Sequence, residues 1–306
     1  MDNRDAKPPI LVIGGTGTVG SRLVQHLSSR CYPVIAASRS RSQTDGHDHG
    51  IVFDWHDHST WSNPFRAAAG PLRAVYIVAS PVVDSAPIMM EFIDFARDKG
   101  VRRFVLQSSS ATESGGPAVG KVHAYLRELG QRGEVDWAVL RPTWFQQNFG
   151  EQPFYIKSIK DESRLYSATS DAKIPWVSAD DIAAVAAKCL TSPDPPNTEY
   201  LVLGPELLSY SDIADILTKV LGRKIVHVDL SRRDLEKRHQ SFGMPEESFK
   251  MMGALQTSIK FGSENRTNDA ILTLTGAAPK MFAEYAESAK AIWEPGDPRK
   301  HIDVYA

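Results

Sequence analysis

The first half of the chain alternates short apolar runs with stretches whose apolar positions recur at helical spacing. Each run is nearly continuous in Val, Ile and Leu, which is typical of a strand buried on both faces of a parallel sheet. The expected strands are Ile10–Gly14, Pro33–Ala37, Gly50–Phe53, Ala74–Ser80, Arg103–Ser108 and Trp137–Arg141. The expected helices between them are Ser21–Arg30, Ile88–Lys99 and Lys121–Arg132. Parallel strands joined through helices need right-handed crossovers, so the pattern predicts a doubly wound α/β fold of the Rossmann type.

The pattern becomes less regular after Arg141. Ala179–Leu190 is expected to form a helix and Tyr200–Gly204 the last strand of the sheet. More polar helical stretches follow at Ser211–Leu221, Arg233–Phe242, Glu246–Ser258 and Lys280–Trp293. We therefore expect a Rossmann domain of residues 1–150 plus 173–204. A smaller, mostly helical C-terminal lobe would comprise residues 151–172 plus 205–306.

Composition narrows the class of protein. With 306 residues the chain can bury roughly three quarters of its unfolded surface, so its core needs no disulfide or metal. The 35 basic and 37 acidic residues nearly cancel, which argues against nucleic acid or an anionic membrane as partner. No uncharged apolar run reaches about 18 residues, so no membrane span is expected. Cys31 and Cys189 are interpreted as small buried thiols, which favours a cytoplasmic protein without a disulfide.

A glycine-rich loop follows the first expected strand and opens the first expected helix. Gly14, Gly17 and Gly20 have the GxxGxxG spacing of dinucleotide-binding loops. Side chains there would block a pyrophosphate from the N–H groups and positive dipole end of the helix. Gly20 would also let the helix pack closely on the strand. The loop residues expected to hold the cofactor are Gly14, Thr16, Gly17, Thr18, Val19 and Gly20.

The end of the second expected strand indicates which dinucleotide binds. A site specific for NAD would place a carboxylate there, whereas this chain has Ser38 and Arg39. Arg39 can grip a ribose 2′-phosphate with two hydrogen bonds and stack on adenine, which favours NADPH. The alternative is a solvated basic loop end. Asp54 is expected near the adenine amino group, and Ser80 and Pro81 near the central ribose.

Two His-x-His pairs flank the third expected strand. They are His47 with His49, and His56 with His58. Residues two apart share one face of a strand, so each pair could chelate a metal ion. The pairs lie at opposite ends of the strand, however, and no third ligand is near either one. A solvated loop is therefore the favoured interpretation, with no metal.

Four segments of the chain carry a family resemblance: residues 14–20, 108–110, 140–145 and 174–183. Together they resemble the NmrA-like branch of the short-chain dehydrogenase/reductase superfamily. Within that branch, residues 120–129 and 203–210 are similar to the fungal ergot-alkaloid reductases of the festuclavine synthase and agroclavine dehydrogenase type.

The resemblance implies an NADPH-dependent oxidoreductase of fungal indole-alkaloid biosynthesis. Its hydrophobic substrate would be an iminium, or another activated C=N or C=C group, in a tetracyclic alkaloid formed from chanoclavine-I aldehyde. Fold alone does not decide function, so two other functions stay open. One is a redox-sensing regulator that binds NADP and a protein partner, as the namesake of the family does. The other is an isomerase or cyclase on the same scaffold.

The usual proton donor of the superfamily is missing. Carbonyl reduction uses Tyr-x-x-x-Lys, a phenol whose pKa a lysine lowers, and this chain has no such motif. The candidate catalytic residues are Lys121 and Tyr125, which share a helix face in reversed order. Lys121 is placed similarly to the lysine of isoflavone-reductase-like relatives. The alternatives are an exposed lysine and a half-buried core tyrosine. An iminium accepts hydride without an acid, so the absence fits its reduction and also fits a protein that only binds NADP.

An aromatic substrate pocket is expected beyond the sixth strand. Ligands of open α/β sheets bind outside the carboxyl ends of the strands, where this segment begins. Ser108, at the end of the fifth strand, is expected beside the cofactor. The expected pocket residues are Ser109, Trp144, Phe145, Phe149 and Trp176. The alternative is that these aromatic side chains form the core of the C-terminal lobe.

Overall fold

The computed structural model describes residues 7–39, 50–79 and 85–294, and the chain forms two units. The first unit takes in the described parts of Met1–Pro142, Ala179–Val202 and Ala270–Ala277. The second takes in those of Thr143–Ser178, Leu203–Asp269 and Ala278–Ala306. These bounds differ from the expected ones, because residues 143–150 and 173–178 fold with the second unit. Helix α11 (Ala270–Thr275) instead packs on helix α7 (Ala179–Thr191) and strand β9 (Thr198–Val202) of the first unit.

A parallel sheet of seven strands forms the centre of the first unit. The strand order is β3-β2-β1-β4-β5-β6-β9, and every neighbouring pair is parallel. The strands are β1 (Ile10–Ile13), β2 (Val34–Ser38), β3 (Gly50–Val52), β4 (Ala74–Val78), β5 (Arg103–Gln107), β6 (Asp136–Pro142) and β9 (Thr198–Val202). The order reverses between β1 and β4, which is where a doubly wound sheet binds its ligand. The predicted Rossmann fold is confirmed.

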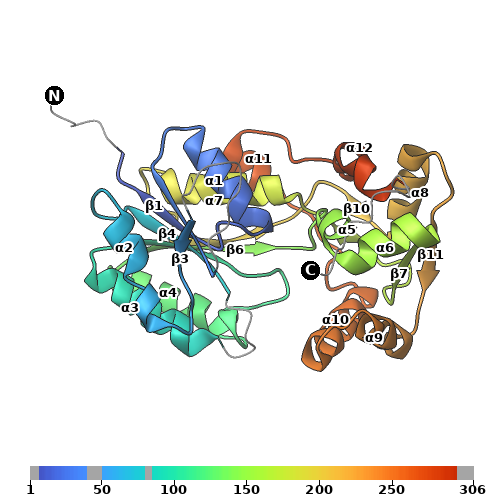
Figure 1. The fold of residues 1–306 in the computed structure, drawn as a ribbon, viewed down its shortest axis with the longest axis horizontal. Helices are drawn as coiled ribbons and strands as arrows, with labels where there is room; N and C mark the ends of the chain where they lie inside the picture. Colours follow the sequence, from blue (N-terminus) through green and yellow to red (C-terminus); the bar gives the residue numbers. More distant parts are fainter. Residues whose placement is uncertain (1–6, 40–49, 80–84, 295–306) are drawn as a thin grey trace. The chain divides into compact units, whose positions relative to one another are not determined.

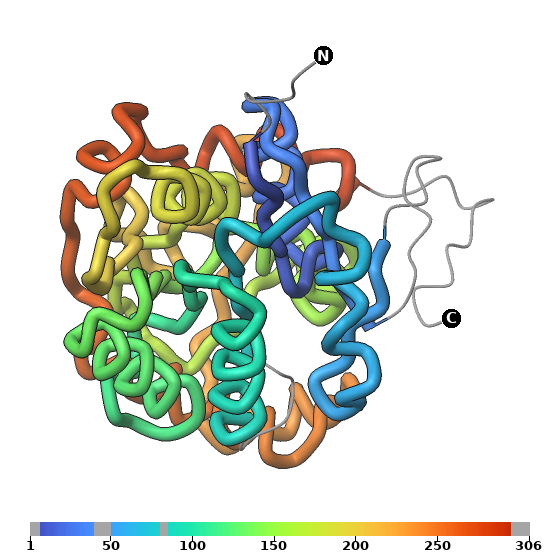
Figure 2. The backbone as a smooth tube through the Cα atoms, turned by 90° about the vertical axis from the view of Figure 1, so that its left-hand side faces the viewer, coloured from blue at the N-terminus to red at the C-terminus, as the bar shows by residue number. Residues whose placement is uncertain are grey.

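Helices cover both faces of this sheet (Figure 1). On one face α1 (Thr18–Ser28) packs against α7 (Ala179–Thr191), and α11 packs on α7. On the other lie α2 (Asn63–Ala67), α3 (Ala86–Asp98) and α4 (Val119–Gln131). Figure 2 views these layers from the left-hand side of Figure 1, with α3 beside α4. Both faces of the inner strands are therefore buried, as their continuous apolar runs predicted.

The second unit is mostly helical around an aromatic core. Its helices are α5 (Asn148–Glu151), α6 (Pro153–Glu162), α8 (Tyr210–Leu221), α9 (Arg232–Ser241), α10 (Glu246–Lys260) and α12 (Phe282–Trp293). Its strands form two short pairs, β7 (Arg164–Ser167) with β11 (Val226–Asp229) and β8 (Ile174–Pro175) with β10 (Leu207–Leu208). The sequence pattern predicted α8, α9, α10 and α12. It did not predict the short elements, whose apolar runs are too brief to show a period.

The two cysteines differ in environment. Both are free thiols, but Cys31 is exposed and only Cys189 is buried. The interpretation of Cys31 as buried was wrong, because it lies in the exposed turn after α1, where its N–H donates to the carbonyl oxygen of Ser28 at 2.9 Å. Burial raises the pKa of the Cys189 thiol to about 12. Within the described residues, no helix is long and apolar enough to cross a membrane.

Candidate dinucleotide and active site

The glycine loop is a tight turn pinned to the neighbouring strand. The backbone N–H groups of Gly14 and Gly15 both donate to the carbonyl oxygen of Ala37 in β2, at 2.8 and 3.0 Å. Gly14 has a φ of 72°, which favours glycine, and a Cβ there would lie 2.7 Å from Cγ2 of Val78. Helix α1 then begins at Thr18, with Gly17 as its N-cap and no side chain capping it. The N-terminus of α1, with its positive dipole end, thus follows directly on the glycine turn.

The loop is shaped so that backbone, not side chains, faces a ligand. A Cβ on Gly20 would lie 2.0 Å from the carbonyl oxygen of Gly14, so α1 could not pack as it does. Thr16 and Gly17 are exposed, and a Cβ on Gly17 would stand 3.3 Å from the same oxygen. Because the Val19 side chain is buried, Val19 would contact a ligand through its backbone N–H. This glycine cradle fits the pyrophosphate of a dinucleotide.

The ends of β2 and β3 provide polar groups for the other half of a dinucleotide. Ser38 ends β2 half-buried, and Arg39 directly after it is exposed. Asp54 follows β3 in a turn where its Oδ1 accepts a hydrogen bond from the N–H of His56, at 2.9 Å. Ser80 and Pro81, expected at the central ribose, lie outside the described residues. Arg39 is therefore a cation available to a ligand phosphate.

The carboxyl end of β5 leads into three serines with different surroundings. The Ser108 Oγ is enclosed, and no described residue hydrogen-bonds to it. The Ser109 Oγ lies 2.9 Å from Oγ1 of Thr112, and the N–H of Ser110 donates to the carbonyl oxygen of Pro142 at 2.8 Å. A buried hydroxyl without a partner is costly. Ser108 is thus the serine suited to a hydrogen bond from a bound cofactor.

The two candidate catalytic residues are in different situations. Lys121 is exposed in the first turn of α4. Tyr125 is half-buried between α3 and α4, where its hydroxyl donates to Oδ1 of Asp94. Burial and this hydrogen bond raise the pKa of Tyr125 to about 12. These contacts disfavour Tyr125 as a proton donor, because Asp94 accepts its hydroxyl hydrogen bond between the two helices.

Of the four aromatic residues expected in the substrate pocket, two are fully buried and two are half-buried. Phe149 and Trp176 are fully buried in the core of the second unit, with ring centroids 4.9 Å apart. Phe149 also packs edge-on against Phe282, at 5.3 Å. For these two the expected pocket role is corrected, because neighbouring rings enclose them. Trp144 and Phe145 are half-buried and follow β6 directly, so they stay candidates for substrate contact.

Of the two histidine pairs, only His56 and His58 lie among the described residues. His56 and His58 are exposed, and the His58 ring lies against Trp61 with centroids 4.1 Å apart. His47 and His49 lie outside the described residues. Across residues 7–39, 50–79 and 85–294, no three His, Cys, Asp or Glu side chains are grouped to hold a metal ion.

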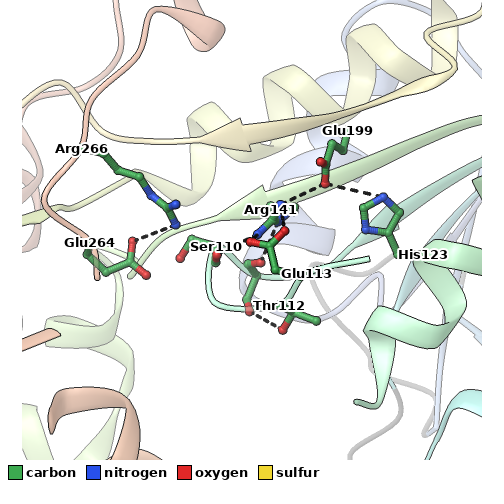
Figure 3. A network of polar contacts seen from close by, with 9 residues as sticks. Ser110, Thr112, Glu113, His123, Arg141, Glu199, Glu264 and Arg266 are labelled. Carbon is green, nitrogen blue, oxygen red and sulfur yellow. Dashed lines mark hydrogen bonds and ion pairs between the residues drawn. The ribbon is translucent and has the colours of Figure 1, made fainter. Parts of the chain in front are cut away.

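A buried polar network at the end of β6 was missed by the sequence reasoning. Arg141 reaches Glu113 and Glu199, and Glu199 lies 3.6 Å from Nε2 of His123 (Figure 3). The Arg141 side chain is 4% exposed. Burial lowers the pKa of His123, whose ring lies beside Trp137, and so favours its neutral form. The signal in the sequence was an arginine directly after the apolar run Trp137–Leu140, since such a charge is buried only when it is paired.

Comparison with known proteins gives a consistent result. Residues 6–286 match the model of the NmrA-like family. The chain is 43% identical to festuclavine synthase II of Penicillium roqueforti, over 93% of this chain and 99% of that protein. It is 40% identical to agroclavine dehydrogenase of Claviceps fusiformis, over 93% and 98%. The fold resembles the Citrobacter sp. triphenylmethane reductase complexed with NADP(H), with a TM-score of 0.75 at 20% identity, covering 92% of this chain and 99% of that one.

Proposed function

The chain belongs to the NmrA-like family, and we propose that it is a cytoplasmic NADPH-dependent reductase that transfers hydride to an iminium of an indole alkaloid. NADPH as the cofactor is supported mainly by the glycine cradle of Gly14, Gly17 and Gly20 before α1, and by exposed Arg39 at the end of β2. The substrate class is supported by the names of the festuclavine synthase and agroclavine dehydrogenase relatives. Other activated C=N or C=C groups belong to the same proposal.

Each part of the cofactor is assigned to residues of the first unit. The backbone N–H groups at Thr18, Val19 and Gly20 would bind the pyrophosphate, which the helix dipole also stabilises. Arg39 would bind the 2′-phosphate, and Asp54 the adenine amino group.

At the other end of the cofactor, Ser108 and Lys121 would hold the nicotinamide ribose. The enclosed Ser108 hydroxyl gains the hydrogen-bond partner that it otherwise lacks. Both residues flank the connection between β5 and α4, which lies at the carboxyl edge of the sheet where ligands of this fold bind.

The chemistry requires orientation rather than a protein acid. When bound, NADPH supplies the hydride, and the iminium carbon accepts it as the positive nitrogen becomes a neutral amine. The chain therefore has to hold the nicotinamide and the substrate in a reactive geometry and exclude competing water. The phenol of Tyr125 is bound to Asp94 and is not required as a proton donor. Trp144 and Phe145 stay predictions for aromatic contacts to the substrate, and Ser109 stays a prediction for a polar one.

A substrate panel tests this assignment. The purified protein is given NADPH with a cyclic iminium, an enone, a quinone or a simple ketone. NADPH oxidation is followed by the loss of absorbance of the reduced nicotinamide. Oxidation with the iminium and reduced product by mass spectrometry is the expected result. Activity confined to the ketone would contradict the proposal. NADPH binding without turnover on any compound would instead favour a regulator that senses the cofactor.

A further inference from the structure

Arg141 makes an unusual set of contacts for a residue inside a parallel strand. It is the last but one residue of β6, and its side chain is almost completely buried. Its guanidinium donates to both carboxylate oxygens of Glu113 and to Oε2 of Glu199 at 3.0 Å. It also donates to the carbonyl oxygens of Ser109 and Ser110, at 3.4 and 3.1 Å. Figure 3 shows the guanidinium between the two carboxylates.

Three of these acceptors belong to one segment, the connection of residues 108–118 between β5 and α4. The same connection passes close to Gly120, where an added Cβ would lie 2.6 Å from the carbonyl oxygen of Glu113. The N–H of Gly115 donates to the carbonyl oxygen of Gly120 at 2.8 Å. Ala118, at the N-cap of α4, has a φ of 49°, a conformation that an alanine keeps only when its surroundings impose it. Contacts from Arg141 and from the start of α4 therefore hold the connection together.

The fourth acceptor, Glu199, connects Arg141 to the last strand of the sheet. Glu199 belongs to β9, the strand beside β6, and it faces His123 of α4 as well as Arg141. Glu113 is 74% exposed, so its carboxylate is not needed to fill space in the core. Both of its carboxylate oxygens accept hydrogen bonds from the Arg141 guanidinium, and such a two-point contact fixes the orientation of the two groups as well as their distance.

A buried arginine at the other end of the same sheet offers a comparison. Arg103, at the first residue of β5, is 6% exposed and pairs with Asp136 at 3.2 Å. Its other acceptor is the carbonyl oxygen of Ser192. It therefore ties the amino ends of the strands to the end of α7, away from the edge where ligands of this fold bind.

We propose that Arg141 is a positioning residue: its guanidinium clamps the 108–118 connection and thereby fixes Ser108 and Lys121 for the nicotinamide half of the cofactor. This inference rests on the proposed function for the identity of the ligand. The clamp itself follows from contacts within the first unit. It acts on the reactive half of the dinucleotide and leaves the glycine cradle and Arg39 untouched.

The test compares Arg141→Lys with Arg103→Lys in the full-length protein. Lysine keeps the charge but cannot hold two carboxylates and two carbonyl oxygens at once. Glu113→Gln, at an exposed side chain, weakens the same clamp without disturbing the core. Each variant is measured by amide hydrogen exchange of residues 109–116, by thermal unfolding, and by the dissociation constants of NADPH and of 2′-phospho-ADP. The second ligand lacks nicotinamide and its ribose, so it reports the cradle alone.

The clamp predicts that Arg141→Lys speeds exchange of these amides by about tenfold and weakens NADPH binding by about five- to tenfold. The dissociation constant of 2′-phospho-ADP should stay within about twofold of its value in the unaltered protein. Glu113→Gln should change the exchange rate and the NADPH dissociation constant in the same direction but by less. Arg103→Lys should lower the unfolding temperature with the ratio of the two dissociation constants unchanged.

Equal weakening of both ligands in Arg141→Lys, or unchanged exchange of residues 109–116, would overturn the clamp. If Arg141→Lys does not fold, an unchanged ratio in Glu113→Gln overturns it. Failure of the unaltered protein to bind either ligand overturns the proposed cofactor instead, and the exchange rates then still decide whether Arg141 holds the connection.

Discussion

Two glycine substitutions in one loop should separate folding from cofactor binding. A Cβ at Gly20 would lie 2.0 Å from the carbonyl oxygen of Gly14 and 2.8 Å from its carbon, so α1 would have to move away from β1. Such overpacking costs about 1–3 kcal/mol, so Gly20→Ala should lower the unfolding temperature by several degrees. A Cβ at Gly17 would lie 3.3 Å from that oxygen, on a backbone with a φ of −80° that alanine adopts freely. Gly17→Ala should therefore cost only about 1 kcal/mol of stability, the usual loss at an N-cap.

The methyl group of Gly17→Ala would nonetheless stand in the space assigned to the pyrophosphate. We expect its NADPH dissociation constant to rise at least about tenfold, which corresponds to about 1.4 kcal/mol. Thermal unfolding and fluorescence titration with NADPH measure the two effects on the same samples. Gly70→Ala is the control, because no atom lies within 4 Å of a Cβ there. A Gly17→Ala protein that binds NADPH as tightly as the unaltered one would refute the placement of the pyrophosphate.

Three further predictions follow from individual side chains. Arg39→Ala should narrow the preference for NADPH over NADH by about ten- to a hundredfold in kcat/KM, and an unchanged ratio would show that no 2′-phosphate lies there. Tyr125→Phe should cost about 1 kcal/mol of stability through the lost bond to Asp94 and change turnover by less than about threefold, whereas a loss near a thousandfold would identify a proton donor. Burial lowers the pKa of His239 from 6.5, and neither ring nitrogen has a hydrogen-bond partner among the described residues. The folded state thus favours the neutral ring, so its contribution is present above pH 6.5 and is lost as the pH falls below it. His239→Leu should flatten the loss of stability between about pH 7 and 5, as measured by urea unfolding, and an equally steep loss in the variant would assign the acid sensitivity elsewhere.

The strands and the cofactor loop could be predicted because their signals are local. A run such as Ile10–Ile13 is buried on both faces wherever it lies in a parallel sheet, so composition alone identifies it. Gly14 and Gly20 are required by contacts with the adjacent strand β4 and within the loop, and their spacing in the sequence reflects those contacts directly. The basic end of β2 likewise needs no knowledge of distant residues.

The aromatic and titratable candidates needed information that the sequence does not contain. Trp144 and Phe149 both follow β6, yet the first is half-buried and the second is enclosed by rings from α6, α8 and α12. Tyr125 shares a helix face with Lys121, but Asp94 of α3 takes its hydroxyl. The burial and the hydrogen-bond partners of these side chains depend on which elements pack together, and the periodicity of a helix does not predict that. Arg141 was overlooked for the same reason, since its partners come from α4's leading connection and from β9.

Isotope transfer from the cofactor tests the central claim most directly. The protein is incubated with a cyclic iminium and NADPH carrying deuterium at C4 of the nicotinamide, in separate reactions with each face labelled. Direct hydride transfer predicts that one of the two labelled cofactors adds a single deuterium to the carbon next to the product nitrogen, and that the other adds none. A reduced product without deuterium from either cofactor, or no reduced product while NADPH remains bound, would contradict the account.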